Sequence, residues 1–402
     1  MTHEPLHGKT GFDDWRSVTM AVFMALVGYS VMVGIPVIST AWVTQLGFSE
    51  VQVGRVAGAD LGGLSAGSVL ASLVMGKVNR RMLVLLGAAI AIAANAGCMV
   101  FQQYEQVLWL RVLAGIGNGV VTAVAVATLG ATYKPARAFN ILLFAFAFSQ
   151  FAEIRYLPYL SMNGIYLAFI VALVPAVVLV RWIPAYPIGH ERAAAPPPES
   201  ILTESRSAFP DVPKYVPWLC LFGIFATYIN IGAYWTYIEL ASLDSGVDAK
   251  WTGDVLAGAS FLSIVGCLFA TVLSNRFGLA RPLFGALMTM AIIVGMLANG
   301  VTDMKLLVSA FMFNFLWIFI DVYQMSSVAN VDRTGAFASL MPGAQGLGQI
   351  VGPNLAASIL GLQLGYRGVF IMCSSAAILG LVIYLVLYSR LKKINPEVAD
   401  AP

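Results

Sequence analysis

The chain has 402 residues, of which 59% are hydrophobic and 11% are charged, and its formal net charge is +3. A soluble domain carries about 25% charged residues, so this composition excludes a soluble protein and indicates an all-α polytopic membrane protein. A membrane β-barrel would show alternating segments of about ten residues, whereas this chain has long uninterrupted apolar runs. The four cysteines all lie inside apolar runs, which argues against a disulfide framework or a metal cluster.

Twelve apolar runs are long enough to cross a membrane, since a span needs about 20 apolar residues. Residues 1–16 are polar and show no cleavable signal pattern, so the run that follows is predicted to be the first span. The first six runs cover residues 18–38, 51–74, 82–101, 106–128, 138–158 and 162–182. The second six cover residues 215–238, 252–274, 282–300, 305–328, 335–361 and 367–390.

The segment between the two sets of runs, residues 183–213, is rich in proline and charge, which is typical of a linker. The predicted domains are an N-terminal six-helix bundle (1–182), a cytoplasmic linker (183–213) and a C-terminal six-helix bundle (214–402). With a cytoplasmic N-terminus, most lysines and arginines fall on the inside. The outside loops then hold only Arg55, Lys250, Lys305 and Arg367. Both termini and the linker are therefore predicted to be cytoplasmic.

The first two spans each hold one conspicuous polar residue. Tyr29 is the one deep polar aromatic residue of the first span, and it either lines a cavity or bonds another helix. Asp60 lies mid-membrane in the second span among small residues. Intramembrane acids are costly and often functional, so Asp60 is a candidate for proton coupling. It could equally pair with a charged group in the first half or in the eleventh span.

The fourth span carries a polar stripe. Arg111, Gly115, Asn118 and Thr122 follow at helical spacing and share one face. A guanidinium at membrane depth costs roughly 2.5 kcal/mol or more unless it faces protein or water. We therefore expect residues 110–127 to form one wall of a shared cavity, with Arg111 and Asn118 as candidate substrate-binding residues. Gly115 and Gly119 have the spacing that also allows close helix packing.

The fifth span contains Gln150, Glu153 and Arg155. Counted from the outer ends of the spans, Glu153 lies near the depth of Arg111 in the antiparallel fourth span. The sequence therefore predicts an ion pair between Arg111 and Glu153, which would offset part of the cost of burying both. Glu153 and Arg155 are candidates for an ion pair or for proton coupling.

The tenth span holds a second stripe at steps of three, four and three: Asn314, Trp317, Asp321 and Gln324. Such a face is predicted to line a cavity. Asp321 is either a proton carrier and cation partner or a structural carboxylate bonded to a neighbouring helix. Proton coupling requires a carboxyl group that binds and releases a proton. A carboxylate in a low dielectric is costly to charge, which favours proton binding.

The seventh span repeats this spacing with Thr227, Asn230, Tyr234 and Tyr237. Tyr237 is near the membrane interface, where aromatic residues are common anchors. Asn230 and Tyr234 are deeper, and we expect them to bind substrate together with Tyr29, Asn314, Trp317 and Gln324.

Two short basic turns occupy matching places in the two halves. Gly76-Lys-Val-Asn-Arg-Arg81 follows the second span, and Asn275-Arg-Phe-Gly-Leu-Ala-Arg281 follows the eighth. With Arg111, Gly115 and Gly117 in the fourth span, the full-length pattern resembles the major facilitator superfamily. The resemblance implies two pseudo-symmetric six-helix bundles that rock about a central site lined by the first, fourth, seventh and tenth helices. The fifth span, residues 139–158, lacks the glycine-rich motif of the drug antiporters of that family.

The sequence predicts secondary active transport of a small organic solute, an aromatic or carboxylated metabolite, by proton-coupled alternating access. Two intramembrane arginines would suit an anion, and tyrosine and tryptophan would stack on a ring. The alternative is a proton-driven exporter of drugs or other amphipathic compounds. No phosphate-binding loop is present, and no histidine lies near membrane serines, so ATP drive and hydrolase chemistry are disfavoured.

Expected partners are the solute, protons and the lipid bilayer of the inner (plasma) membrane. We expect a monomer, without metal, cofactor, nucleic acid or enzymatic activity.

Overall fold

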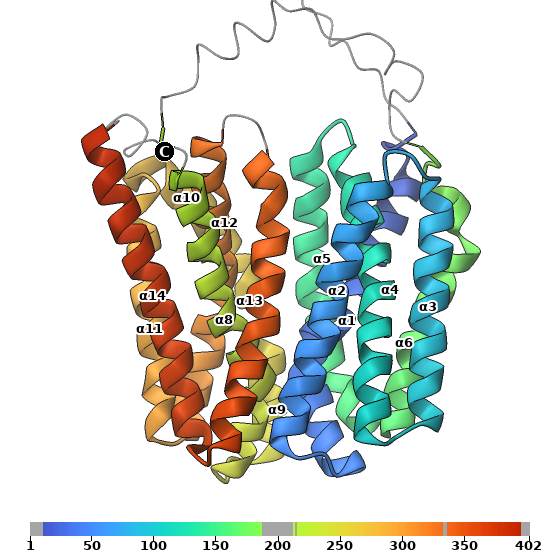
Figure 1. Ribbon diagram of the computed structural model, residues 1–402, viewed down its shortest axis with the longest axis horizontal. Coiled ribbons are helices and arrows are strands. Elements are labelled where there is room, and N and C mark those ends of the chain that lie inside the picture. The colour runs from blue at the N-terminus through green and yellow to red at the C-terminus, as the bar shows by residue number, and fades with distance from the viewer. Residues whose placement is uncertain (1–10, 187–211, 214, 333–335, 395–402) are drawn as a thin grey trace, which may run out of the picture. The chain divides into compact units, whose positions relative to one another are not determined.

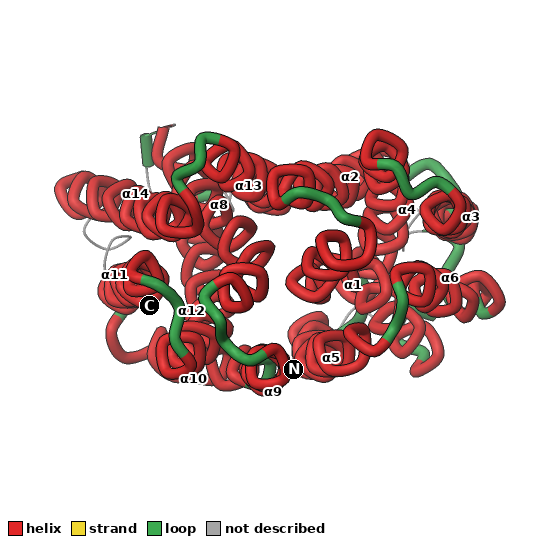
Figure 2. Tube along the Cα trace, turned by 90° about the horizontal axis from the view of Figure 1, so that it is seen from below, coloured by secondary structure: helices red, strands yellow, loops and turns green. Residues whose placement is uncertain are grey.

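The computed structural model of the chain describes residues 11–186, 212, 213, 215–332 and 336–394, and these residues form helices joined by short turns (Figure 1). Figure 2 shows the helices end on, and the described part of the chain contains no strand. They form two compact units. Unit 1 comprises the described residues within 1–34 and 59–195, and unit 2 those within 35–58 and 196–402.

Unit 1 is built from six helices of the first half of the chain. They are α1 (Trp15–Leu46), α2 (Glu50–Val74), α3 (Arg80–Val100), α4 (Tyr104–Gly130), α5 (Pro135–Tyr156) and α6 (Met162–Val178), with the short 3₁₀ helices η1 (Leu157–Tyr159) and η2 (Val180–Trp182). The last part of α1, from Ile35, and the first part of α2, to Gly58, belong to unit 2.

Unit 2 also contains every described helix of the second half. They are α8 (Tyr215–Asp244), α9 (Ala249–Ala259), α10 (Leu262–Phe277), α11 (Ala280–Gly295), η3 (Met296–Asn299), α12 (Asp303–Val331), α13 (Ala336–Gly361) and α14 (Gly365–Ile394).

The helices overlap the predicted spans, and the all-α transmembrane fold is confirmed. Ten described segments are long and apolar enough to cross a membrane. Of the other two, α6 has 17 residues, and α13 contains Pro342 and Pro353 together with several amide side chains, which make it less apolar. The predicted eighth span is divided into α9 and α10, because the helix is interrupted at Ser260 and Phe261.

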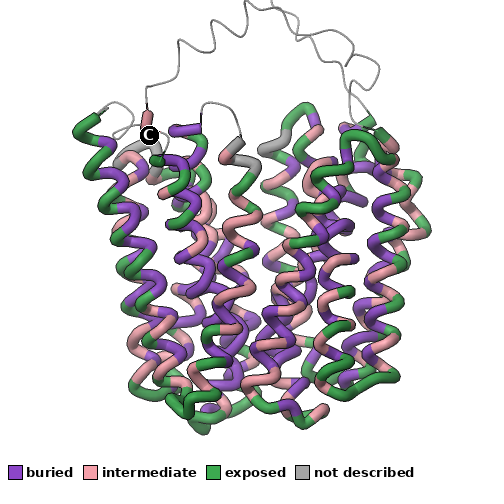
Figure 3. The backbone as a smooth tube through the Cα atoms, viewed as in Figure 1, coloured by how far each residue is buried: buried purple, intermediate pink, exposed green. Residues whose placement is uncertain are grey.

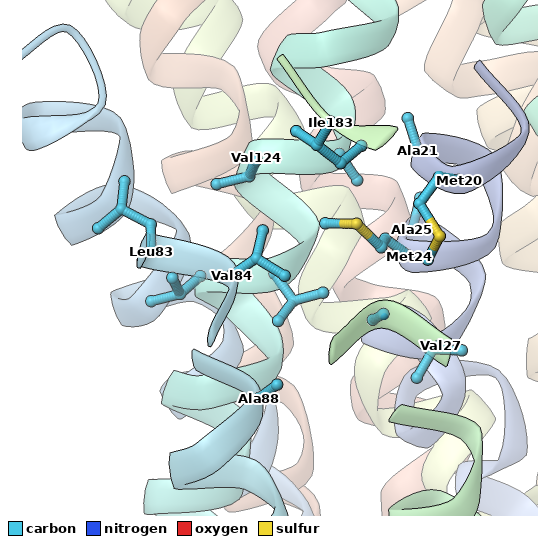
Figure 4. Close-up of a cluster of buried hydrophobic side chains, with 14 of the residues drawn as sticks. Met20, Ala21, Met24, Ala25, Val27, Leu83, Val84, Ala88, Val124 and Ile183 are labelled. Atoms are coloured by element: carbon cyan, nitrogen blue, oxygen red, sulfur yellow. The ribbon is translucent and has the colours of Figure 1, made fainter. Parts of the chain in front are cut away.

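Buried and exposed residues alternate along the helices, as Figure 3 shows for α3 and α14. The apolar core of unit 1 lies between α1, α3, α4 and the end of α6 (Figure 4). Met20 and Met24 of α1, Val84 and Ala88 of α3, and Val124 of α4 all belong to this cluster.

Glycines set a close helix contact of unit 1, between α2 and α4. A Cβ added at Gly115 would collide with the backbone oxygen of Asp60, and one at Gly63 with that of Val112. The Ser68 hydroxyl of α2 donates to the Gly119 carbonyl at 3.0 Å. The predicted close approach at Gly115 and Gly119 is therefore confirmed, since only small residues permit this backbone separation.

The first basic turn fastens α3 to the end of α6. Asn79 caps α3 by accepting a hydrogen bond from the Arg81 backbone N–H at 2.9 Å. The Arg81 guanidinium donates to the carbonyls of Ile183 at 2.7 Å and Arg181 at 2.9 Å. In the second turn the side chains of residues 274–277 lie outside the described part. Gly278 ends α10 with φ of +66°, a conformation that favours glycine. Most of the predicted linker, residues 187–211, also lies outside the described residues.

Candidate functional site

The stripes of the seventh and tenth spans meet in unit 2, on α8 and α12. The Tyr228 hydroxyl of α8 donates to Asp321 Oδ2 of α12 at 2.7 Å. The Trp317 indole lies one turn away on α12, with its Nε1 atom 3.5 Å from the same hydroxyl. A tyrosine and a tryptophan thus flank the carboxyl group of Asp321, which is half-buried. Tyr228 lies on a face adjacent to the predicted stripe, and sequence reasoning missed its role.

Several polar atoms of this cluster lack a hydrogen-bond partner. The Gln324 amide donates to the Thr227 hydroxyl at 2.8 Å, but its oxygen has no partner. Asp321 Oδ1 and both amide atoms of Asn230 are likewise buried without a partner, and Asn230 is 0% exposed. Buried polar groups are nearly always hydrogen-bonded, so these atoms mark a place where a ligand or water completes the bonding. We name Asp321, Tyr228, Trp317, Gln324 and Asn230 the α8–α12 cluster.

Two other predicted substrate residues pack into the helix interface. The Tyr234 hydroxyl shares a hydrogen bond with Ser309 at 2.9 Å, and its ring stacks on Phe313 with centroids 4.0 Å apart. Asn314 donates to the Ala310 carbonyl one turn earlier on its own helix, at 3.1 Å. The Tyr234 hydroxyl and the Asn314 amide nitrogen are therefore already bonded within and between the two helices.

Glu239 of α8 is a further buried carboxyl group that sequence reasoning missed. Its side chain is 8% exposed and is hydrogen-bonded to Thr40 of α1, which also belongs to unit 2. The residue falls just outside the predicted span 215–238, whereas α8 continues to Asp244. Extending the span by a single residue would have shown an intramembrane acid on this helix.

In unit 1 the Arg111 side chain has a different partner from the one predicted. Its Nε atom donates to Asp60 Oδ2 at 2.6 Å, and its Nη1 atom donates to Asn95 Oδ1 of α3 at 2.8 Å. The Tyr166 ring lies 5.8 Å from the guanidinium carbon, and Arg111 is only 1% exposed. The predicted Arg111–Glu153 pair is wrong, because Asp60 and Asn95 take that place. Asp60 thus pairs with a first-half group, and its candidacy for proton coupling stays a prediction.

The remaining candidates of unit 1 lie apart from this ion pair. Glu153 accepts a hydrogen bond from Ser149 at 3.2 Å, and Arg155 donates to the Tyr159 hydroxyl at 3.3 Å. Tyr29 packs edge-on against Phe146, with centroids 6.1 Å apart. Asn118 is buried, and its side-chain oxygen has no hydrogen-bond partner.

Comparison with known proteins identifies the family. The family model described as Major Facilitator Superfamily matches residues 19–353. The chain belongs to this superfamily. Membership makes it a multi-pass membrane protein and a secondary transporter of small molecules, and it confirms the resemblance seen in the sequence. No curated protein sequence matches the chain.

Solved structures of superfamily transporters share the fold. The crystal structure of a D-xylose-proton symporter has a TM-score of 0.73 at 12% identity, covering 96% of this chain and 99% of that chain. The nucleoside transporter NupG has a TM-score of 0.70 at 9% identity, covering 92% of this chain and 98% of that one. A mutant form of NupG gives 0.70 at 10% identity, covering 92% of this chain and 99% of that one. At these identities the comparisons support a common fold within the superfamily. The nature of the solute has to be inferred from the side chains of this chain.

Proposed function

We propose that this superfamily member carries an aromatic solute with hydrogen-bonding groups across the cytoplasmic (inner) membrane, coupled to protons, with Asp321 as the proton-carrying group. The α8–α12 cluster binds the solute: Trp317 and Tyr228 contact a ring, and the amides of Asn230 and Gln324 bond its polar groups. Residues 1–182 and 214–402 act as two six-helix bodies joined by the linker 183–213. By rocking against each other they open the site to one side of the membrane and then to the other. The protein works as a monomer and has no enzymatic activity.

The observation that carries the proposal is the set of unsatisfied atoms around Asp321. A carboxyl oxygen, an amide oxygen and a whole amide group are buried without partners on two adjoining helices. A polar solute that supplies donors and acceptors here would form hydrogen bonds with these atoms. One similar structure is that of a proton symporter, and a buried acid that can change its charge is the group such coupling requires.

A carboxylated aromatic solute remains part of the proposal, although its cationic partner is not Arg111. The guanidinium of Arg111 is bonded to Asp60 and Asn95, so we assign it to the packing of α2, α3 and α4. In unit 1, Tyr29 and Asn118 stay as proposed solute contacts, because the Asn118 oxygen lacks a partner. Arg155 stays as a proposed cation for an acidic solute.

Asp321→Asn tests the coupling. Purified full-length protein is first screened by thermal shift with aromatic carboxylates, neutral aromatic solutes and amphipathic cations, since a ligand stabilises the state that it binds. The stabilising compound is then added to proteoliposomes that contain a pH-sensitive dye. We expect compound-driven proton movement in the wild type and none in Asp321→Asn.

Asp303→Asn is the matched control, because Asp303 lies at the exposed start of the same helix and loses the same charge. It should retain the proton movement of the wild type. Full coupling in Asp321→Asn would contradict the proposal, and stabilisation by amphipathic cations alone would favour the exporter alternative instead.

A further inference from the structure

Unit 1 contains a cavity whose lining includes none of the residues assigned to solute transport. It has a volume of about 720 Å³ and lies between α1, α5 and α6. Small-molecule sites in proteins typically enclose about 300–1,000 Å³. The lining is almost wholly apolar, with four phenylalanine rings from the three helices: Phe23, Phe144, Phe148 and Phe169. We name this space the α1–α5–α6 cavity.

The cavity exists because α5 packs loosely. The segment Arg137–Tyr159 has 28% of its most apolar window buried, the lowest share among the ten described spans. The α5 sequence has no glycine, and bulky phenylalanines recur along it. Between α2 and α4, by contrast, glycines on both helices bring the backbones together. Phe144 and Phe148 are 56% and 48% exposed, so the cavity opens at the surface of α5, where a molecule can enter sideways.

A single carboxyl group interrupts the apolar lining. Glu153 lines the cavity, and its Oε1 atom accepts a hydrogen bond from Ser149 at 3.2 Å. Its Oε2 atom is buried and has no hydrogen-bond partner. No lysine or arginine is among the described residues that line the cavity, and the Arg111 guanidinium is occupied by Asp60 and Asn95. A charged carboxylate in such surroundings is costly until a cation joins it.

We propose that the α1–α5–α6 cavity is a binding site for a lipophilic amine, whose ammonium group pairs with Glu153 and whose apolar body lies among the four phenylalanine rings. The carboxylate supplies the charge complement, and the aromatic rings add cation–π attraction to an ammonium group near their faces. The volume accommodates an arylalkyl chain. The proposal does not rest on the α8–α12 cluster, because every lining residue belongs to unit 1.

The test measures binding of phenylhexylamine and of phenylhexanol, its neutral analogue, to the full chain in phosphatidylcholine nanodiscs. Empty nanodiscs correct for partition into lipid. We expect saturable binding of one amine per chain, with clearly weaker binding of the alcohol. Glu153→Gln should weaken amine binding by at least about tenfold, because it removes one partner of a buried charge pair. Glu105→Gln, an exposed carboxyl group of unit 1, should leave amine binding unchanged.

A second variant keeps the test decisive if Glu153→Gln folds poorly. Ala172→Phe fills the cavity while Glu153 is retained, so it should abolish binding of both compounds. Ala96→Phe, on an exposed position of α3, adds the same bulk elsewhere and should have no effect. Equal binding of amine and alcohol, unchanged binding in Glu153→Gln, or no saturable binding would overturn the proposal. Loss of amine binding in Asp321→Asn alone would also overturn it, by assigning the amine to unit 2.

Discussion

At the scale of single residues, the buried charges of Arg111 and Asp60 in unit 1 compensate each other. Arg111 has one carboxylate and one amide oxygen as partners, and all three side chains are buried. Burying an arginine and an aspartate removes both from water, and their attraction repays that cost only when the geometry is good. The pair therefore holds α2, α3 and α4 together but adds little to the net free energy of unfolding.

This balance predicts an asymmetric response to substitution. Asp60→Leu leaves Arg111 charged and unpaired in the helix interior, so the free energy of unfolding should fall by about 3 kcal/mol or more. The double variant Asp60→Leu/Arg111→Met removes both charges and should recover most of that loss, because apolar residues of similar volume replace an ion pair at little net cost. Unfolding in mixed detergent micelles measures both values.

Glu105→Gln serves as the control, since it removes an exposed charge that forms no part of the pair, and its stability should match the wild type. A double variant as unstable as the single one would show that the pair itself stabilises the fold.

Sequence reasoning located these residues but paired them wrongly. Depth along the spans made Glu153 a partner for Arg111 as credible as Asp60. The pairing depends on how closely the helices approach each other. The glycines around Asp60 on α2, together with Gly115 and Gly119 on α4, allow a close approach. The glycine-free α5 cannot approach in this way. Depth and glycine pattern together would have selected Asp60 as the partner of Arg111. The unpaired atoms of Asn230 and Asp321, by contrast, depend on side-chain packing, which cannot be read from residue spacing.

At the scale of helices, close packing by glycine should be testable one position at a time. Gly115→Ala places a methyl group against the Asp60 carbonyl on α2, so the two helices must separate. We expect a loss of about 1–3 kcal/mol in the free energy of unfolding, the usual cost of overpacking. Unfolding in mixed micelles again provides the measurement.

Gly285→Ala on α11 is the matched control, because an added Cβ there meets nothing within 4 Å. Alanine is a better helix former than glycine by up to about 1 kcal/mol, so this variant should equal or slightly exceed the wild type. Equal stabilities of the two variants would mean that α2 and α4 do not need their close contact.

The helices themselves were largely predictable, because apolar runs of membrane length specify spans without knowledge of the tertiary fold. The differences arise at their ends and breaks. The predicted span 215–238 is shorter than α8, which continues through Glu239 to Asp244. The break between α9 and α10 has no proline or charge to mark it. There the backbone N–H groups of Ser260 and Phe261 donate to carbonyls three residues back, those of Ala257 and Gly258.

At the scale of the whole molecule, the distribution of lysine and arginine predicts on which side of the membrane each loop lies. The basic turn at Lys77 is predicted to be cytoplasmic and the turn at Gln102, at the other end of α3, to be outside. Both side chains are exposed. Among the native cysteines, Cys98, Cys220 and Cys373 are buried, so only Cys267 needs replacement to give an unreactive background.

Single cysteines at these two positions test the orientation directly. In intact cells that carry the Cys267→Ser background, a membrane-impermeant maleimide should label Gln102→Cys at once. Lys77→Cys should react only after the membrane is permeabilised, because the positive-inside rule keeps its turn in the cytoplasm. The background protein without either cysteine should stay unlabelled under both conditions. The reverse pattern would invert the topology, and with it the side from which the α8–α12 cluster receives its proton.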